Sequence, residues 1–437
     1  MDLKRILLVI SVFSVPFLAV SPWQKVGVVP VGIIYVLLMA LLLLINGQQL
    51  ISSLKNLCTK NRFLMPILAY FTLIVLSIVG QGVTGGLQSQ HLIRLGYMVF
   101  SLGIFVFFAV GIQDQDTFKT VVKTYLLAAA VACIYALYVT IGYLLGFQTG
   151  QTLEWTVPRM YGTATEAQVF GNFLLSVLPL LMGLLLYKIN LFKSWLNIIF
   201  LSLYLLCLVM TFSAGAWFGA VIGIIPLVFC LRKFNGKTIL PILLAVGISA
   251  MSLLAIDHWI YPNYSTGFDS ILIKFVGTPE QEKANLRPID VQINMISVEE
   301  RQWFRQAAWN MFKAHPIMGV GYGNYGYVYN EYRPADTPKL DIYVRAHNQY
   351  LEILAELGIV GITLMGLVVF QIIKLAWRVL SQDQPKEQQI IFISLLGSLV
   401  ALSAQGMTLG VFLHNYFWVV LGLTYGAARL SLIDKGI

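Results

Sequence analysis

Charged residues are scarce in this sequence, and their scarcity excludes an ordinary soluble protein. Asp, Glu, Lys and Arg make up 11% of the 437 residues, whereas hydrophobic residues make up 58%. Soluble domains carry about 25% charged residues. Long apolar runs such as VGIIYVLLMALLLLI, residues 31–45, are typical of helices that satisfy their own backbone hydrogen bonds in lipid. We therefore predict an all-α polytopic membrane protein.

Cysteine and clustered metal ligands are also lacking. The four cysteines lie in apolar segments or at their ends, which excludes a disulfide framework and a zinc-binding spacing. The segment SPWQK, residues 21–25, connects the first two apolar segments on the side interpreted below as the outside, and it contains no acid. Metal-dependent lipid-linked oligosaccharyltransferases need carboxylates there, so this argues against that class. Asp114 precedes Thr117 and a new helix, where Asp is a good cap. No metal and no cofactor are expected.

The apolar segments predict about twelve transmembrane helices. The first follows a basic head without a small-x-small cleavage site, so we interpret it as a retained helix rather than a signal peptide. No internal repeat is visible, which disfavours a transporter. The predicted spans lie near residues 6–21, 26–45, 63–80, 92–112, 119–147, 167–187, 195–211, 213–231, 238–256, 348–373, 388–408 and 411–430.

Basic residues predict the orientation of these spans. Lys and Arg gather on one set of connections, which identifies the cytoplasmic side and places both termini inside. For the same reason the net charge of +9 does not indicate nucleic-acid binding. The predicted division is a membrane bundle over residues 1–256, a large, partly helical outside loop over 257–346, and C-terminal spans over 347–437.

The outside loop contains an amphipathic pattern, SVEERQWFRQAAWNMFKAHP. Ser297 and Glu300 fit a capping box at the start of a helix, and Pro316 would close it. Arg301 and Arg305 are four residues apart and share one face. Paired guanidinium groups can bind phosphate, although a solvated helix face or lipid headgroup binding is the commoner role of such a pair.

The stretch AHNQYLEILAELGIVG, residues 346–361, follows the loop. Treated as one helix, it places His347, Gly358 and Gly361 on a single seam that a neighbouring helix could approach closely. Glu352 and Glu356 would face the other side and be structural. A neutral His347 could accept a proton from a hydroxyl group, and an interfacial histidine on an ordinary packed helix is the alternative. Arg345 would add a further positive charge beside it.

These motifs resemble the O-antigen ligase and O-antigen polymerase superfamily. His347, Asn348, Gly358 and Gly361 match its motif of His, then Asn, Ser or Gln, nine residues, Gly, two residues and a final Gly, Thr or Tyr. The loop segment RQWFRQAAWNMFKAHPIMGVGYGNY, which begins at Arg301, is similar to the family's Arg-led helix with a His-Pro and GVGxGN turn. The twelve-span layout is similar too.

The resemblance implies a bacterial inner-membrane enzyme that works on the outer side. It would move a glycan from undecaprenyl diphosphate to a hydroxyl of a glycolipid or glycan acceptor, without a metal. His347 and Arg301 would be catalytic, His347 as general base and Arg301 as a diphosphate contact. The residues expected to bind substrate are Arg159, Arg305, Arg345, Asn348 and Tyr325. Tyr325 belongs to a tyrosine cluster that could stack on sugars, although packing within a folded loop is the commoner role of such rings.

One position departs from the family. The family often has Ser-Arg-Gly at the outside end of a middle helix, and this chain has Ala214 between Ser213 and Gly215. Arg159, Arg94 or Arg305 could compensate, or the chain could be inactive, altered or use another donor. The sequence favours a ligase that uses lipid A–core, with a polymerase that uses a second lipid-linked unit as the alternative and a lipid-linked sugar transporter as the least favoured.

Overall fold

The chain folds almost entirely into helices. The computed structural model describes residues 3–18, 25–26, 29–30, 63–83, 86–147, 149, 159–164, 166–189, 191–230, 236–260, 288–382 and 385–433. Two short strands, β1 (Lys25–Val26) and β2 (Val29–Pro30), pair antiparallel. The helices are α1 (Leu3–Ser14), α3 (Leu64–Val83), α4 (Ser89–Gly111), α5 (Gln115–Leu144), α6 (Ala167–Leu186), α7 (Ser194–Met210), α8 (Ala214–Gly223), α9 (Ile225–Cys230), α10 (Gly236–Ile260), α12 (Pro288–Ala314), α13 (Tyr325–Tyr332), α14 (Gln349–Leu380), α15 (Lys386–Gln405) and α16 (Asn415–Ile433), with short 3-10 turns η1 (Val15–Leu18) and η2 (Val411–Leu413).

Six of the described helices are long and apolar enough to cross a membrane. They are α3, α4, α5, α6, α14 and α15, and three shorter apolar segments lie at 194–210, 214–229 and 239–252. The predicted membrane protein is thus supported, while the predicted count of twelve spans is not confirmed. The predicted span 26–45 lies largely outside the described residues.

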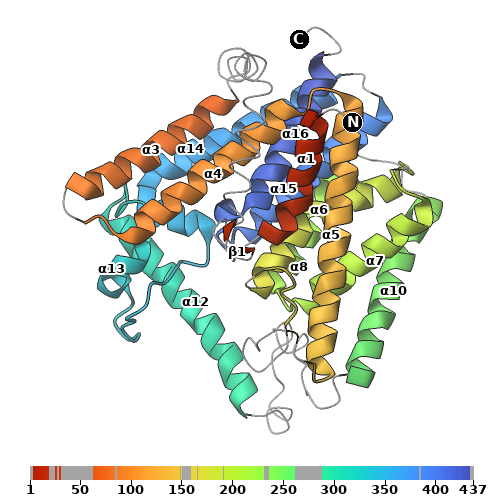
Figure 1. The fold of residues 1–437 in the computed structure, drawn as a ribbon. Coiled ribbons are helices and arrows are strands. Elements are labelled where there is room, and N and C mark those ends of the chain that lie inside the picture. The colour runs from red at the N-terminus through yellow and green to blue at the C-terminus, as the bar shows by residue number, and fades with distance from the viewer. Residues whose placement is uncertain are drawn as a thin grey trace.

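Helix α6 forms the centre of the bundle and is buried along its whole length. Helix α15 packs along α6 and α8, and α16 packs along α4. Small residues allow the α8–α15 contact, since a side chain at Gly219 would approach the Ala401 carbonyl to 2.8 Å. The start of α1 and the end of α16 lie at one end of the molecule, and α12 projects at the other (Figure 1).

The predicted division at Phe212 is present in the structure. Helix α7 ends at Met210, α8 begins at Ala214, and Phe212 takes a left-handed backbone with φ of 48° between them. The predicted cap of α5 is also confirmed, because Asp114 accepts a hydrogen bond from the Thr117 amide at 2.7 Å. The predicted capping box at Ser297 is wrong, since α12 begins nine residues earlier at Pro288 and Ser297 lies inside it.

The single helix predicted from His347 through Gly361 is also wrong. Helix α14 begins at Gln349 with Asn348 as its cap, and it breaks at Gly358, where φ is 61° and ψ is −156°. The break is filled by residues 316–321 of the preceding turn. The Ile359 amide donates to the Pro316 carbonyl at 2.8 Å, and the Val320 amide donates to the Ala355 carbonyl at 2.9 Å.

This turn supplies new partners for the backbone groups of two hydrogen bonds that α14 lacks at the break. An unbroken helix would join the amides of residues 359 and 360 to the carbonyls of 355 and 356. Here the Val360 amide donates to the Ile317 carbonyl at 3.3 Å and the Gly321 amide donates to the Glu356 carbonyl at 2.9 Å. Interrupted backbone is tolerated at membrane depth only where protein supplies these partners. The glycine at position 358 thus admits the 316–321 turn rather than a neighbouring helix.

Candidate functional site

His347 lies between the segment 288–346, which contains α12 and α13, and the head of α14. Its backbone is left-handed, with φ of 47°, and its ring stacks on Phe304 of α12 with centroids 5.9 Å apart. Within the part of the chain that the structure describes, neither ring nitrogen of His347 makes a hydrogen bond. Phe304 therefore holds the ring by packing, and a nitrogen is left able to accept a proton.

The surroundings of His347 keep its imidazole neutral. Burial, and then the positive charges of Arg301 and Arg345, lower the pKa of His347 from 6.5 to about 4. A neutral imidazole is the form that can act as a base. The predicted partners are thus brought together, because Arg301 and Arg305 of α12 and Arg345 all act electrostatically on this one ring.

Two arginines on α12 form the positively charged side of the site. Burial, followed by repulsion from Arg305, lowers the pKa of Arg301. The Nε atom of Arg305 is buried and has no hydrogen-bond acceptor among the described residues. Burying a donor in this way costs free energy that a phosphate oxygen would recover. This side of the site is therefore suited to an anion.

Glu166 is a member of the site that sequence reasoning missed. It stands exposed at the residue before α6, and its negative charge acts on Arg301. In the surrounding stretch PRMYGTATEAQVFGN, residues 158–172, the sequence indicates a role only for Arg159. Because residues 166 and 301 are far apart in sequence, no local pattern indicates that the two charges are neighbours.

Arg159 lies beside the turn that precedes Ala214. Its guanidinium donates to the Thr211 carbonyl at 3.0 Å and to the Phe212 carbonyl at 3.4 Å. These carbonyls belong to the turn between α7 and α8, directly before Ser213 and Ala214. Arg159 therefore places a positive charge at this turn from a different part of the chain.

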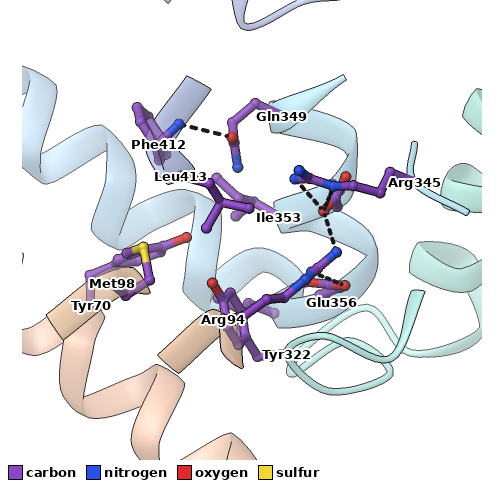
Figure 2. Close-up of a pocket in the computed structure, with 12 residues that line it drawn as sticks. Tyr70, Arg94, Met98, Tyr322, Arg345, Gln349, Ile353, Glu356, Phe412 and Leu413 are labelled. Atoms are coloured by element: carbon purple, nitrogen blue, oxygen red, sulfur yellow. Dashed lines mark hydrogen bonds and ion pairs between the residues drawn. The ribbon is translucent and has the colours of Figure 1, made fainter. Parts of the chain in front are cut away.

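Arg94 is used elsewhere. It is 5% exposed and pairs with two carboxylates of α14, at 3.2 Å from Glu352 and 3.0 Å from Glu356. Figure 2 shows Arg94 next to Glu356, below Arg345. A guanidinium engaged by two carboxylates has little positive charge left for a diphosphate. Of the three arginines considered as substitutes at position 214, Arg94 is thus the least available.

Three of the predicted substrate contacts have structural partners. Arg345 pairs with Glu352 at 2.9 Å and remains 30% exposed. Asn348 caps α14, because its side chain accepts from the Tyr350 and Leu351 amides at 3.1 Å. Tyr325 is fully buried, and its hydroxyl donates to the Phe304 carbonyl at 2.6 Å. This placement suits a packing role for Tyr325 rather than the predicted stacking on a sugar.

An apolar groove of about 620 Å³ reaches the first turn of α14. It is lined by α3, α8, α9, α14, α15 and α16, and almost all of its lining is aliphatic or aromatic. Tyr350, in the first turn of α14, reaches it and donates to the Ser403 carbonyl at 2.6 Å. The groove thus reaches the same end of α14 as His347.

The arrangement can take a proton and hold an anion without a metal ligand set. Among the described residues, no group of three or more His, Cys, Asp or Glu side chains is placed to hold a metal ion. A base and an arginine pair side by side suit the transfer of a group away from a phosphate.

Comparison with known proteins identifies a related family. The O-antigen ligase family model matches residues 198–366, which include α12, the 316–321 turn, His347 and the break in α14. No curated protein matches the chain.

Proposed function

We propose that this chain, in which the O-antigen ligase family model matches residues 198–366, transfers a glycan from undecaprenyl diphosphate to an acceptor hydroxyl at the outer face of a bacterial inner membrane. The family indicates a membrane glycosyltransferase of the O-antigen ligase or polymerase type. The observation that carries the proposal for this chain is the His347 ring packed on Phe304 of α12, where the charges of Arg301 and Arg345 act on it.

The proposed reaction is a direct displacement at the anomeric carbon. His347 accepts the proton of the acceptor hydroxyl, whose oxygen forms the new bond to that carbon. The bond from the carbon to the phosphate oxygen breaks, and its electron pair leaves with the diphosphate. Arg301 and Arg305 stabilise this negative charge. Arg159 supplies a further positive charge near Ala214, where the family often has an arginine. The groove under Tyr350 has the composition to accept the isoprenoid chain of the donor.

Direct displacement predicts inversion of the anomeric centre. Retention would require a carboxylate nucleophile. Glu352 and Glu356 are unsuitable, because both are buried and paired with arginine. Glu166 is the exposed carboxylate near Arg301, so a retained configuration in the product would point to Glu166 and contradict the direct route.

The acceptor separates the two forms of the proposal. A ligase uses lipid A–core, and a polymerase uses a second lipid-linked unit, with the same donor chemistry. We favour the ligase form. Purified protein in detergent should be given undecaprenyl-diphosphate-linked glycan with each acceptor in turn. Turnover without compartments would contradict a transporter, and the acceptor that is consumed decides between ligase and polymerase.

Arg301 is tested in the same assay. Arg301→Ala should impair use of the donor more than Arg301→Lys, because the lysine keeps one positive charge. Lys313→Ala is a matched control, since Lys313 is exposed in the last turn of the same helix. Equal and mild effects of both Arg301 variants would make Arg301 a structural residue.

A further inference from the structure

Glu352 is the centre of a buried group of charges that the proposed reaction does not use. Its Oε1 atom accepts from Arg345 Nη2 at 2.9 Å and from Arg345 Nε at 3.2 Å. The same oxygen lies 3.2 Å from Arg94 Nη2. Its Oε2 atom accepts from the Ala346 amide at 3.3 Å. One carboxylate therefore binds both residues that directly precede His347.

His347 needs such support because of its backbone. A left-handed conformation is unfavourable for a residue other than glycine and persists only where the surroundings enforce it. On its C-terminal side, Asn348 caps α14 and the Gln349 amide donates to the Gly406 carbonyl at 2.7 Å. On its N-terminal side, Glu352 supplies the hydrogen bonds to Arg345 and Ala346.

Arg94 holds Glu352 in place, and it holds Glu356 as well. The two carboxylates are one turn apart on α14 and are 3% and 2% exposed. Glu356 serves a different segment, because its Oε1 atom accepts from the Tyr325 amide at 3.2 Å. The two glutamates thus lie on the same helix, are both buried and both pair with Arg94. Of the two, Glu352 contacts the residues that precede His347. Figure 2 shows Arg94 and Arg345 converging from different elements.

We propose that Glu352 is a positioning residue for His347, which it fixes through Arg345 and the Ala346 amide while Arg94 anchors it to α4. The proposal rests on the proposed function of His347 as the base. Glu352 itself touches no substrate. Its loss should leave the base present and misplaced, and a misplacement of about 1 Å costs a reaction about 100-fold in rate.

The first test observes the histidine directly and needs no substrate. The chain has five histidines, so ¹⁵N-histidine labelling gives a small spectrum in which His347 is assigned by its absence in His347→Gln. Glu352→Gln keeps the size of the side chain and removes its charge. The His347 resonances should shift in Glu352→Gln and stay in place in Glu356→Gln. Unchanged resonances in Glu352→Gln, or equal shifts in both variants, would overturn the proposal.

The second test uses glycan transfer from the undecaprenyl-diphosphate-linked donor. Glu352→Gln should lower kcat about 100-fold with the donor KM little changed, whereas Glu356→Gln should lower kcat far less. The double variant Glu352→Gln with Arg345→Met should lose no more than the more severe single variant, because both act through one contact. Additive losses, or a changed donor KM alone, would contradict positioning.

A replacement variant covers the case in which Glu352→Gln does not fold, and the histidine spectrum separates failure of the positioning proposal from failure of the proposed function. If Glu352→Gln is not recovered folded, Arg345→Met replaces it, since this variant removes the Arg345 contact and leaves the Arg94–Glu352 pair. It should then shift the His347 resonances, and unshifted resonances would overturn the proposal. If the unmodified protein transfers no glycan with any acceptor, the proposed function fails, and the histidine spectrum still decides whether Glu352 positions His347.

Discussion

At the scale of single residues, His347 differs from His91 and His315 in its partners. His91 is buried and bonds to Asn324 at 2.9 Å, and His315 bonds to the Tyr332 hydroxyl at 2.9 Å. His347 has a ring packed on Phe304 and arginine charges around it. A histidine with a hydrogen bond from a fixed partner is held as structure, whereas His347 is left with a nitrogen for chemistry.

His347→Gln should abolish glycan transfer, because glutamine cannot accept the proton, and should leave the protein folded. Transfer rates and thermal unfolding in detergent measure the two effects. His315→Gln, directly after α12, is the control, and it should keep most of the activity. Near-normal turnover in His347→Gln would remove His347 as the base.

The protonation of His347 should respond to a bound diphosphate. Its pKa of about 4 lies below the ordinary 6.5, so the ring is neutral at pH 7 and gains its proton only as the pH falls through 4. An anion on Arg301 and Arg305 offsets charges that lower the pKa, so undecaprenyl diphosphate should raise it. Histidine NMR titration with and without this ligand measures the change. A pKa that stays fixed while the ligand binds would place the anion elsewhere.

At the scale of elements, the break in α14 joins the two sequence motifs. The turn 316–321 lies against the break in the helix at Gly358. Its backbone pairs with the amides and carbonyls of α14 that the break leaves without helical partners. A side chain at position 358 would meet the Ile317 and Pro316 carbonyls as well as a strained backbone. The glycines of the two motifs are therefore parts of one contact.

Gly358→Ala should destabilise the protein by more than about 1 kcal/mol, because alanine suits neither the left-handed backbone nor the space. Thermal unfolding in detergent measures this change. Gly366→Ala is the matched control on the same helix, since a side chain there would meet no atom within 4 Å. Equal melting temperatures for the two variants would show that the turn can withdraw from α14.

How far the sequence could predict these elements depends on the range of the contacts. Local signals predicted the Asp114 cap and the His347 motif, because a cap and a motif lie within a few residues. The apolar pattern continues across Gly358, so periodicity gave no sign of the break. The Arg94–Glu356 pair joins residues 262 apart, and nothing near either residue indicates the other. Ser297 fitted a cap, but the helix extended past it.

At the scale of the whole molecule, Arg94 connects α4 to α14 and, through Glu356, to the start of α13. It extends from α4 to Glu352 and Glu356 of α14, and Glu356 in turn holds the Tyr325 amide. A cavity of about 20 Å³, enough for one water molecule, lies among these residues. One buried cation thus joins α4, α14 and the start of α13.

Arg94→Met should destabilise the protein by about 3–5 kcal/mol, since it leaves two buried carboxylates without their cation. Lys119→Met is the control, because the Lys119–Glu387 pair is exposed and should contribute less than about 1 kcal/mol. Chemical unfolding in detergent compares the two. Similar losses for both variants would mean that Arg94 is not the anchor described here.

The filled break in α14 also determines where the chain can change in length. The carbonyls of residues 316 and 317 and the amides of 320 and 321 must meet four fixed points on the helix. One residue inserted between 317 and 320, or between 356 and 359, would shift the register so that these four hydrogen bonds could not all form. Residues 333–339 lie outside this constraint, so a change in length there would leave the contact between the turn and α14 in register.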